Sequence, residues 1–110
     1  MIATTLIVDG RNVQRSLWPN IRSERLVDLV RAWSERHELR PLIVFDGRAP
    51  VESDDVVGTG REIADDWIAR KAASYAPYWL VTSDRELRER AGGDAERVIG
   101  GGSFARELTR

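Results

Sequence analysis

Cysteine is absent from this chain of 110 residues. Its absence excludes disulfide bonds, thiolate metal sites and cysteine nucleophiles, and it fits a reducing cytoplasm. Long apolar runs are missing as well, because no stretch reaches the roughly 20 residues that a membrane-spanning helix needs. The first ten residues lack the basic lead of a secretory signal. We therefore expect a cytoplasmic protein without a membrane partner, folded as a single domain over residues 1–110.

Net charge is also small. The chain has 17 Lys and Arg residues against 18 Asp and Glu residues, which gives a formal net charge of -1. A nucleic-acid partner therefore cannot be inferred from bulk charge, and any basic surface has to be local.

What the sequence does contain is a series of short apolar runs separated by helical patterns. These runs are rich in β-branched or aromatic residues and are mostly unbroken, as in strands covered on both faces. They cover residues 4–8, 42–45, 79–82 and 98–99. A glycine-bounded pair, Val56 and Val57, is a candidate for a short edge strand. The alternation predicts an α/β fold, with a mainly parallel central sheet of four or five strands and helices on both faces.

Apolar periodicity predicts the longer helices. One covers residues 23–39, with Ser23 as its N-cap. A second covers residues 62–75, and Thr59 and Glu62 have the spacing of a capping box before it.

Two further helices are predicted towards the end of the chain. Ser83 and Glu86 have capping-box spacing ahead of a short helix. Residues 103–109 are predicted to form the last helix, with their apolar side chains facing inward. The segment 47–60 is predicted to be a mobile surface loop.

Aspartates follow three of the predicted strands directly. They are Asp9, Asp46 and Asp84. The carboxyl ends of parallel strands lie on one rim of a sheet, where ligands bind, so we expect these acids to gather there.

The helix over 62–75 adds acids to the same rim. Its first turn follows the candidate strand at Val56, and Glu62, Asp65 and Asp66 lie on one side of it. Periodicity does not choose between Asp65 and Asp66.

Carboxylates brought this close together repel one another. At an effective dielectric near 20, a like-charge pair about 4 Å apart costs on the order of 4 kcal/mol. Raised pKa values or a divalent cation relieve the repulsion, and oxygen ligands suit Mg²⁺ and Mn²⁺. Histidine ligands are not required, and the single histidine, His37, is predicted away from this rim.

Four motifs carry a resemblance to a known family. They are LIVDGRNV at 6–13, VFDG at 44–47, GREIADDWI at 60–68 and VTSDREL at 81–87. In this order and spacing they resemble the NYN domain, especially its YacP-like branch, within the PIN-like nuclease superfamily. The resemblance spans nearly the whole chain and implies a three-layer PIN-like fold.

The resemblance also implies a metal-dependent endoribonuclease that hydrolyses RNA phosphodiester bonds with Mg²⁺ or Mn²⁺. Asp9, Asp65 and Asp84 match the acidic metal ligands. Asn12 matches an asparagine that orients Asp9 or contacts a substrate phosphate.

Further positions are expected to have supporting roles. Asp46 is expected as an additional ligand on the rim, with Glu62 and Asp66 as secondary residues. Glu86 stands where related nucleases often carry another aspartate. Arg11 stands where an aromatic residue is frequent.

Arginines near the rim are candidates for holding RNA phosphates. The predicted substrate-binding set is Arg11, Arg48, Arg61 and Arg85, and Arg15 and Arg22 lie in similar segments. The expected partner is single-stranded RNA, with the ribosome or a regulatory protein as further candidates, and a homodimer stays open.

The four tryptophans divide into two groups. Trp18 lies in a loop, where it either stacks on a base or packs against the domain, and packing is the favoured interpretation. Trp33, Trp67 and Trp79 lie in apolar patterns and are predicted to be core residues.

Other functions are compatible with the same residues. The acids also have structural interpretations, as turn residues or as first-turn residues of helices. A catalytically silent module that binds RNA or protein is one alternative, and a toxin-like nuclease held by an antitoxin is another. A third is an aspartate-based phosphatase, although such enzymes commonly need a second acid two residues after the nucleophile, where this chain has Arg11.

Overall fold

A five-stranded, all-parallel sheet forms the centre of the computed structural model, which describes residues 3–110. The strands are β1 (Thr5–Asp9), β2 (Arg40–Phe45), β3 (Val56–Gly58), β4 (Tyr78–Val81) and β5 (Arg97–Ile99). Their order across the sheet is β3-β2-β1-β4-β5, so β1 lies in the middle. The α/β fold and the parallel sheet predicted from the sequence are confirmed.

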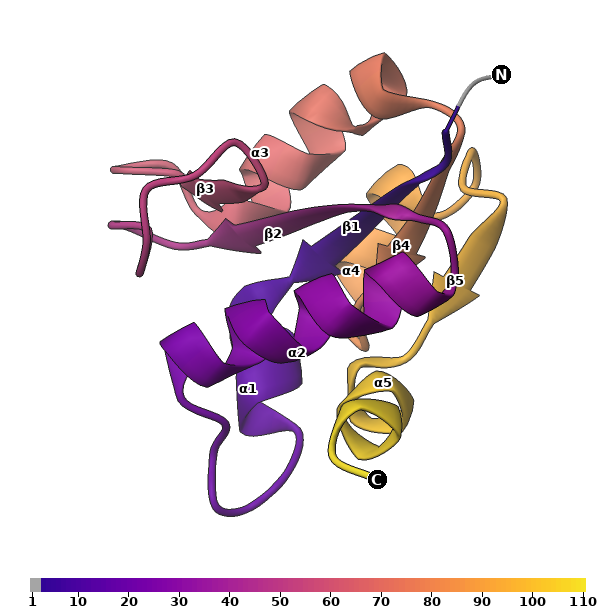
Figure 1. Ribbon diagram of the computed structural model, residues 1–110. Coiled ribbons are helices and arrows are strands. Elements are labelled where there is room, and N and C mark those ends of the chain that lie inside the picture. The colour runs from indigo at the N-terminus through magenta and orange to yellow at the C-terminus, as the bar shows by residue number, and fades with distance from the viewer. Residues whose placement is uncertain (1–2) are drawn as a thin grey trace.

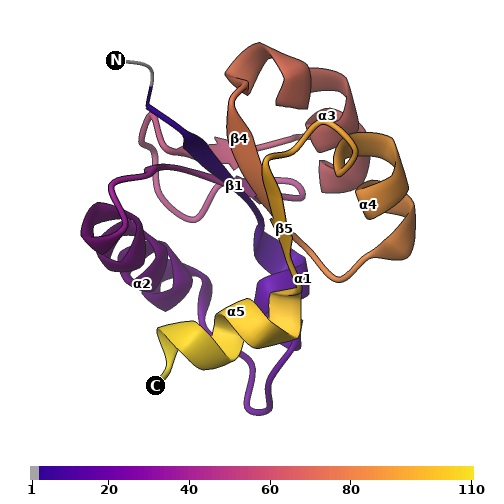
Figure 2. The same cartoon turned by 90° about the vertical axis from the view of Figure 1, so that its right-hand side faces the viewer.

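Helices cover both faces of this sheet (Figures 1 and 2). One layer contains α1 (Gly10–Arg15), α2 (Ser23–Arg36) and α5 (Gly101–Leu108). The other contains α3 (Ala64–Lys71), the 3-10 helix η1 (Ala72–Tyr75) and α4 (Arg85–Ala91). Within residues 3–110, no helix combines the length and the apolar character that crossing a membrane requires.

Alternate residues of the central strand face opposite layers. Leu6 and Val8 belong to the core shared with α1, α2 and α5, whereas Ile7 belongs to the core shared with α3 and α4. All three are fully buried. Burial of such a side chain contributes about 2 kcal/mol, and burial on both faces explains why the strand is apolar without alternation.

The boundaries of α2 differ from the prediction at both ends. Arg22 is the N-cap, and the Ser23 hydroxyl instead accepts a hydrogen bond from Gln14 Nε2 at 2.9 Å. The helix ends at Arg36, and Glu38 adopts a positive φ of 57°. This left-handed residue ends the helix before the predicted limit at 39.

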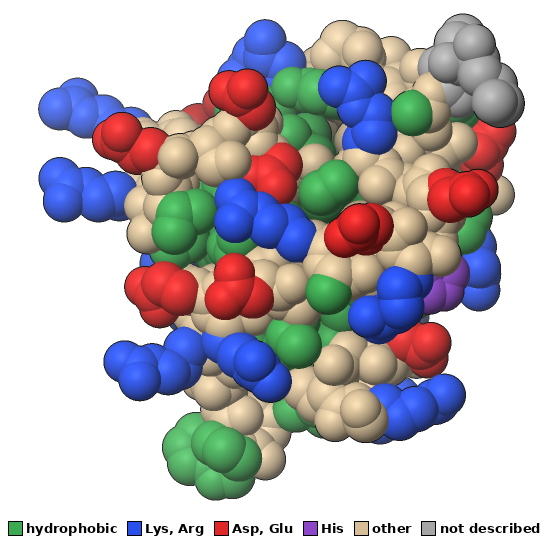
Figure 3. Space-filling model, in the orientation of Figure 1, with side chains coloured by type: hydrophobic (Ala, Val, Ile, Leu, Met, Phe, Trp, Pro, Cys, Tyr) green, Lys and Arg blue, Asp and Glu red, His purple; other side chains and the backbone are tan. Residues whose placement is uncertain are grey.

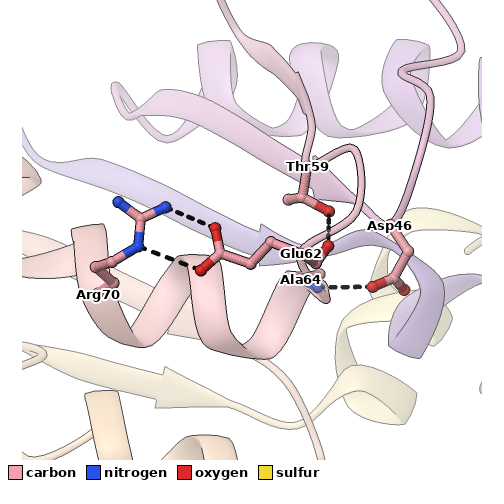
Figure 4. A network of polar contacts seen from close by, with 5 residues as sticks. All are labelled: Asp46, Thr59, Glu62, Ala64 and Arg70. Atoms are coloured by element: carbon pink, nitrogen blue, oxygen red, sulfur yellow. Dashed lines mark hydrogen bonds and ion pairs between the residues drawn. The ribbon is translucent and has the colours of Figure 1, made fainter.

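The predicted capping box ahead of α3 is wrong. Glu62 lies outside the helix, and the Thr59 hydroxyl donates to its carbonyl oxygen at 2.5 Å. The cap comes from a distant segment, because the Ala64 N–H donates to Asp46 Oδ1 at 2.6 Å (Figure 4). A carboxylate at the first N–H groups of a helix also interacts favourably with the helix dipole.

The capping box predicted ahead of α4 is wrong as well. Asp84 is the N-cap, and its Oδ1 accepts from the Leu87 N–H at 2.9 Å. Ser83 Oγ accepts instead from the N–H of Gly101 at 2.7 Å, at the start of α5. That last helix begins two residues before its predicted start.

The segment 47–60 is held to the domain by contacts that a mobile loop would lack. The guanidinium of Arg31 donates two hydrogen bonds of 2.8 Å to the carboxylate of Asp55, which lowers the pKa of Asp55 to about 2. Ala49 and Val51 pack against the core, and the segment includes β3. The prediction of a mobile loop is therefore not supported, whereas the predicted short edge strand is present.

The tryptophans only partly follow the prediction. Trp33 is buried, stacks on His37 and meets Phe104 edge to face. Trp67 and Trp79 are half-buried at the margins of the core. Trp18 is 89% exposed, so the favoured expectation that it packs against the domain is wrong.

Candidate active site

A cleft of about 330 Å³ lies at the carboxyl edge of the sheet. Four aspartates, two arginines, an asparagine and a serine line it. They are Asp9, Arg11, Asn12, Arg15, Ser16, Asp46, Asp65 and Asp84. The predicted ligand acids thus surround one space together with Asn12 and Arg11, while their catalytic and metal-binding roles stay predictions.

Each aspartate comes to the cleft from a different segment. Asp9 is the last residue of β1, and Asp46 directly follows β2. Asp65 lies in the first turn of α3, and Asp84 begins α4 just after β4. Because the strands are parallel, their carboxyl ends place these residues at one edge.

Asp9 is the most buried acid of the cleft, at 5% exposure. Burial raises its pKa to about 6, and the negative charges of Asp65 and Asp46 act in the same direction. The hydroxyl of Thr82 donates to Asp9 Oδ2 at 2.9 Å and partly opposes the rise. Ionising Asp9 in this place is therefore unfavourable unless positive charge is brought near.

Asp65 is the acid of α3 that enters the cleft. Burial raises its pKa, and the nearby charges of Asp84 and Asp46 add to that rise. Asp66 turns away and forms an ion pair with Arg90 at 2.7 Å. The structure therefore makes the choice between the two neighbours that helical periodicity left open.

Asp46 and Asp84 also have structural contacts. Oδ1 of each accepts a hydrogen bond from a helix N–H, of Ala64 in α3 and of Leu87 in α4. Asp46 Oδ2 lies 3.7 Å from Arg11 Nε. These acids fix the starts of α3 and α4 relative to the cleft.

Asn12 connects α1 to the loop after β4. Its Oδ1 accepts from the Ser83 N–H at 2.8 Å, and its carbonyl oxygen accepts from the Ser16 hydroxyl at 2.5 Å. Because the amide oxygen is used in this way, the amide nitrogen is the part of Asn12 suited to donate to a carboxylate or a phosphate.

Gly101 is packed directly against Asn12, which leads to a testable consequence. A Cβ at Gly101 would lie 2.1 Å from Asn12 Oδ1 and 3.1 Å from Ser16 Oγ. We expect Gly101→Ala to displace Asn12, to break its bond to Ser83, and to lower the free energy of unfolding by about 1–3 kcal/mol.

The neighbouring glycine provides the control for this measurement. A Cβ at Gly102 meets nothing closer than the end of the Arg106 side chain at 3.5 Å and the Ser16 Cβ at 4.0 Å, both ordinary contacts. In chemical denaturation we expect Gly102→Ala to be neutral or slightly stabilising, because alanine favours the helix. Equal stabilities of the two variants would contradict the proposed clash.

Several predicted acids lie outside the cleft. Glu62 forms an ion pair of 2.6 Å with Arg70 (Figure 4), and Glu86 is exposed on α4. The cause for Glu62 is the later start of α3, which removes it from the helix face that carries Asp65.

Only some of the arginines predicted to bind substrate line a cleft. Arg11 lines the cleft, and Arg48 lines a second cleft of about 380 Å³ that shares Arg11 and Asp46 with the first. Arg61 and Arg85 are exposed and line neither cleft.

Thr82 and Ser16 were not predicted as parts of the site. Thr82 carries a fully buried hydroxyl and directly follows β4. A polar residue at the end of an apolar strand is the signal that would have indicated it. Ser16 lies four residues after Asn12, on the same side of the helical turn.

The donor set of the cleft suits a hard divalent cation. Four carboxylates and an asparagine offer oxygen ligands of the kind that Mg²⁺ and Mn²⁺ prefer. Within residues 3–110, however, no three acidic, histidine or cysteine side chains are grouped closely enough to hold an ion. Side-chain rotation would have to bring the carboxylates together.

Comparison with known proteins gives a likeness of fold. No family model and no curated protein matches the chain. The solved structure of Rae1 (YacP) from Bacillus subtilis is similar to it with a TM-score of 0.72, over 96% of this chain and 75% of that one, at 21% sequence identity. The chain therefore shares the α/β fold of YacP, in agreement with the fold that the motifs imply.

Proposed function

We propose that this protein is a metal-dependent endoribonuclease that hydrolyses phosphodiester bonds of single-stranded RNA in the acidic cleft. The observation that carries the proposal is the arrangement of four aspartates, from four segments of the chain, around one space. The raised pKa values of Asp9 and Asp65 support it, because acids kept in an unfavourable environment are frequent at functional sites. The likeness to YacP agrees with it at the level of the fold.

In this proposal Asp9, Asp65 and Asp84, with Asp46 beside them, hold Mg²⁺ or Mn²⁺. A cation held there would supply positive charge to the cleft and lower the pKa of a water molecule. Two arginines, Arg11 and Arg15, do not balance four carboxylates, so without added positive charge the cleft repels a phosphate.

Asn12, Arg11 and Arg15 have supporting roles in this proposal. Asn12 has its amide oxygen fixed by Ser83, which leaves the amide N–H groups to orient Asp9 or a phosphate oxygen. Arg11 and Arg15 donate to flanking phosphates. We propose that the protein acts in the cytoplasm, and that the ribosome or a regulatory protein brings it to its RNA.

Metal removal tests the reaction class. We expect a labelled, unstructured RNA to be cut internally in the presence of Mn²⁺ or Mg²⁺, to stay intact in EDTA, and to be cut again when metal is restored. Gel analysis of the products measures this, with DNA of the same sequence as a parallel substrate. Cleavage that persists in EDTA would contradict the metal requirement. RNA binding without cleavage in any metal would favour the silent RNA-binding alternative.

A further inference from the structure

Two large hydrophobic side chains are exposed among residues 3–110, and both lie within two residues, along the chain, of residues that line the acidic cleft. Trp18 is 89% exposed and Ile63 is 56% exposed. Trp18 lies two residues after Ser16, which lines the cleft. Ile63 directly precedes Ala64, whose N–H donates to Asp46 in the cleft. Trp18 follows α1 and Ile63 precedes α3, and these helices lie on opposite faces of the sheet, so the two side chains belong to segments from both layers.

The loop that carries Trp18 is closed at its base. Gln14 Nε2 donates to the carbonyl oxygen of Ile21 at 2.9 Å, and the Ile21 N–H donates to the carbonyl oxygen of Gln14 at 3.2 Å. Ile21 is buried and anchors the far end of the loop. The loop extends beyond α1 in Figure 1, and hydrophobic side chains protrude at the same place in Figure 3. Trp18 is therefore presented to solvent by an anchored loop.

Exposed arginines accompany both hydrophobic side chains. Arg15 and Arg22 lie on either side of Trp18 along the chain, and Arg61 lies two residues before Ile63. Within the described residues none of these three arginines forms an ion pair. Exposed guanidinium groups without an ion pair, together with a flat aromatic ring, fit single-stranded nucleic acid, because arginines bind its phosphates and aromatic rings stack on its unpaired bases.

We propose that Trp18 stacks on an unpaired base of single-stranded RNA that crosses the cleft from the Trp18 loop towards Ile63. The proposal rests on the proposed function in one respect, because it places RNA over the same cleft. A double helix is disfavoured, because its bases already stack on one another and offer no free face to Trp18. The exposed arginines favour RNA over a protein surface as the partner of this region, because they bind phosphates.

The test measures RNA binding separately from cleavage. All variants are made in an Asp84→Asn background, which suppresses the proposed cleavage and keeps the helix cap, since asparagine caps as well as aspartate. The probe is a fluorescein-labelled, unstructured RNA of about 12 nucleotides, and anisotropy gives the affinity. We expect Trp18→Ala to weaken binding at least about fivefold, Trp18→Phe to keep most of the affinity, and the duplex form of the probe to bind more weakly. The control Trp79→Phe, near the amino end of β4, should bind like the parent.

The outcomes separate this inference from the proposed function. Trp18→Ala should leave the melting temperature unchanged, because the side chain is 89% exposed. If the parent binds no RNA, base stacking by Trp18 is wrong. It is also wrong if Trp18→Ala binds RNA within twofold of the parent, and a protein partner then becomes the better explanation for the exposed Trp18. If binding depends on Trp18 but the unmodified protein never cuts RNA, the nuclease function fails and the stacking role stands.

Discussion

Asp9→Asn is expected to make the metal-free protein more stable at neutral pH, by on the order of 2–3 kcal/mol. Asp9 is buried beside Asp46 and Asp65, and its pKa is raised from 3.8 to about 6. A shift of this size corresponds to 1.36 kcal/mol for each pKa unit. The amide is neutral, and its oxygen can still accept the hydrogen bond from Thr82.

The sign of the pH dependence follows from the raised pKa. Well below its ordinary pKa of 3.8, the Asp9 carboxyl is protonated in both the native and the unfolded chain, so its burial carries no electrostatic cost there. As the pH rises from about 4 to about 6, the unfolded chain releases its proton first, and the native state becomes less stable. The advantage of Asp9→Asn should therefore be below about 1 kcal/mol at pH 4 and reach its full size above pH 6.

Urea denaturation at pH 4, 5, 6 and 7.5 in EDTA measures this effect. The expected gain at pH 7.5 corresponds to a rise in melting temperature of roughly 10 °C. Asp66→Asn is the control, because Asp66 is partly exposed and paired with Arg90, and it should show no such gain. A loss of stability in Asp9→Asn at pH 7.5 would mean that the carboxylate is required by the fold. Added Mg²⁺ should stabilise the unmodified chain more than the variant.

The second large effect is expected on RNA cleavage, from two adjacent aspartates. Asp65→Asn should lower cleavage at least about 100-fold, whereas Asp66→Asn should change it less than about threefold. Asp65 lines the cleft, and Asp66 forms an ion pair with Arg90 outside it. Loss of a residue that only supports a metal ligand already changes affinity or activity roughly 10–100-fold, so loss of a ligand should cost more.

This pair of variants is well matched, because both change an aspartate of the same helical turn to asparagine. Initial rates on a labelled single-stranded RNA with Mn²⁺ provide the measurement, and circular dichroism shows that both variants fold. Equal rates for the two variants would remove Asp65 from the reaction. A large loss in Asp66→Asn would mean that the helix face chosen by the structure is wrong.

The sheet and the place of the acids could be predicted because they depend on local patterns. Strands buried on both faces, such as Thr5–Asp9, are apolar without a break. An aspartate directly after such a strand must lie at the carboxyl edge of a parallel sheet, whatever the order of the strands in that sheet. Asp9, Asp46 and Asp84 therefore needed no knowledge of tertiary contacts to be placed.

The features that sequence reasoning missed depend on contacts between distant segments. The cap of α3 comes from Asp46, 18 residues before Ala64, and Thr82 bonds to Asp9 from 73 residues away. No local pattern contains such partners, so a capping box of nearby residues is the wrong prediction for α3. Whether Trp18 folds back or projects depends on the anchoring of its loop at Ile21, which its own neighbours in sequence do not indicate.

The hydrogen bond between Asp46 and the Ala64 N–H makes two cleft acids mechanically dependent on each other (Figure 4). Asp46 directly follows β2, and its carboxylate accepts a hydrogen bond from the N–H of Ala64. Asp65 is the residue after Ala64. A force on the first carboxylate, from a ligand or from a substitution, is thus transmitted to the orientation of α3 and to the second carboxylate. The effects of substitutions at Asp46 and Asp65 on the free energy of unfolding should consequently be non-additive in a double-mutant cycle, since one hydrogen bond connects the segments that carry the two acids.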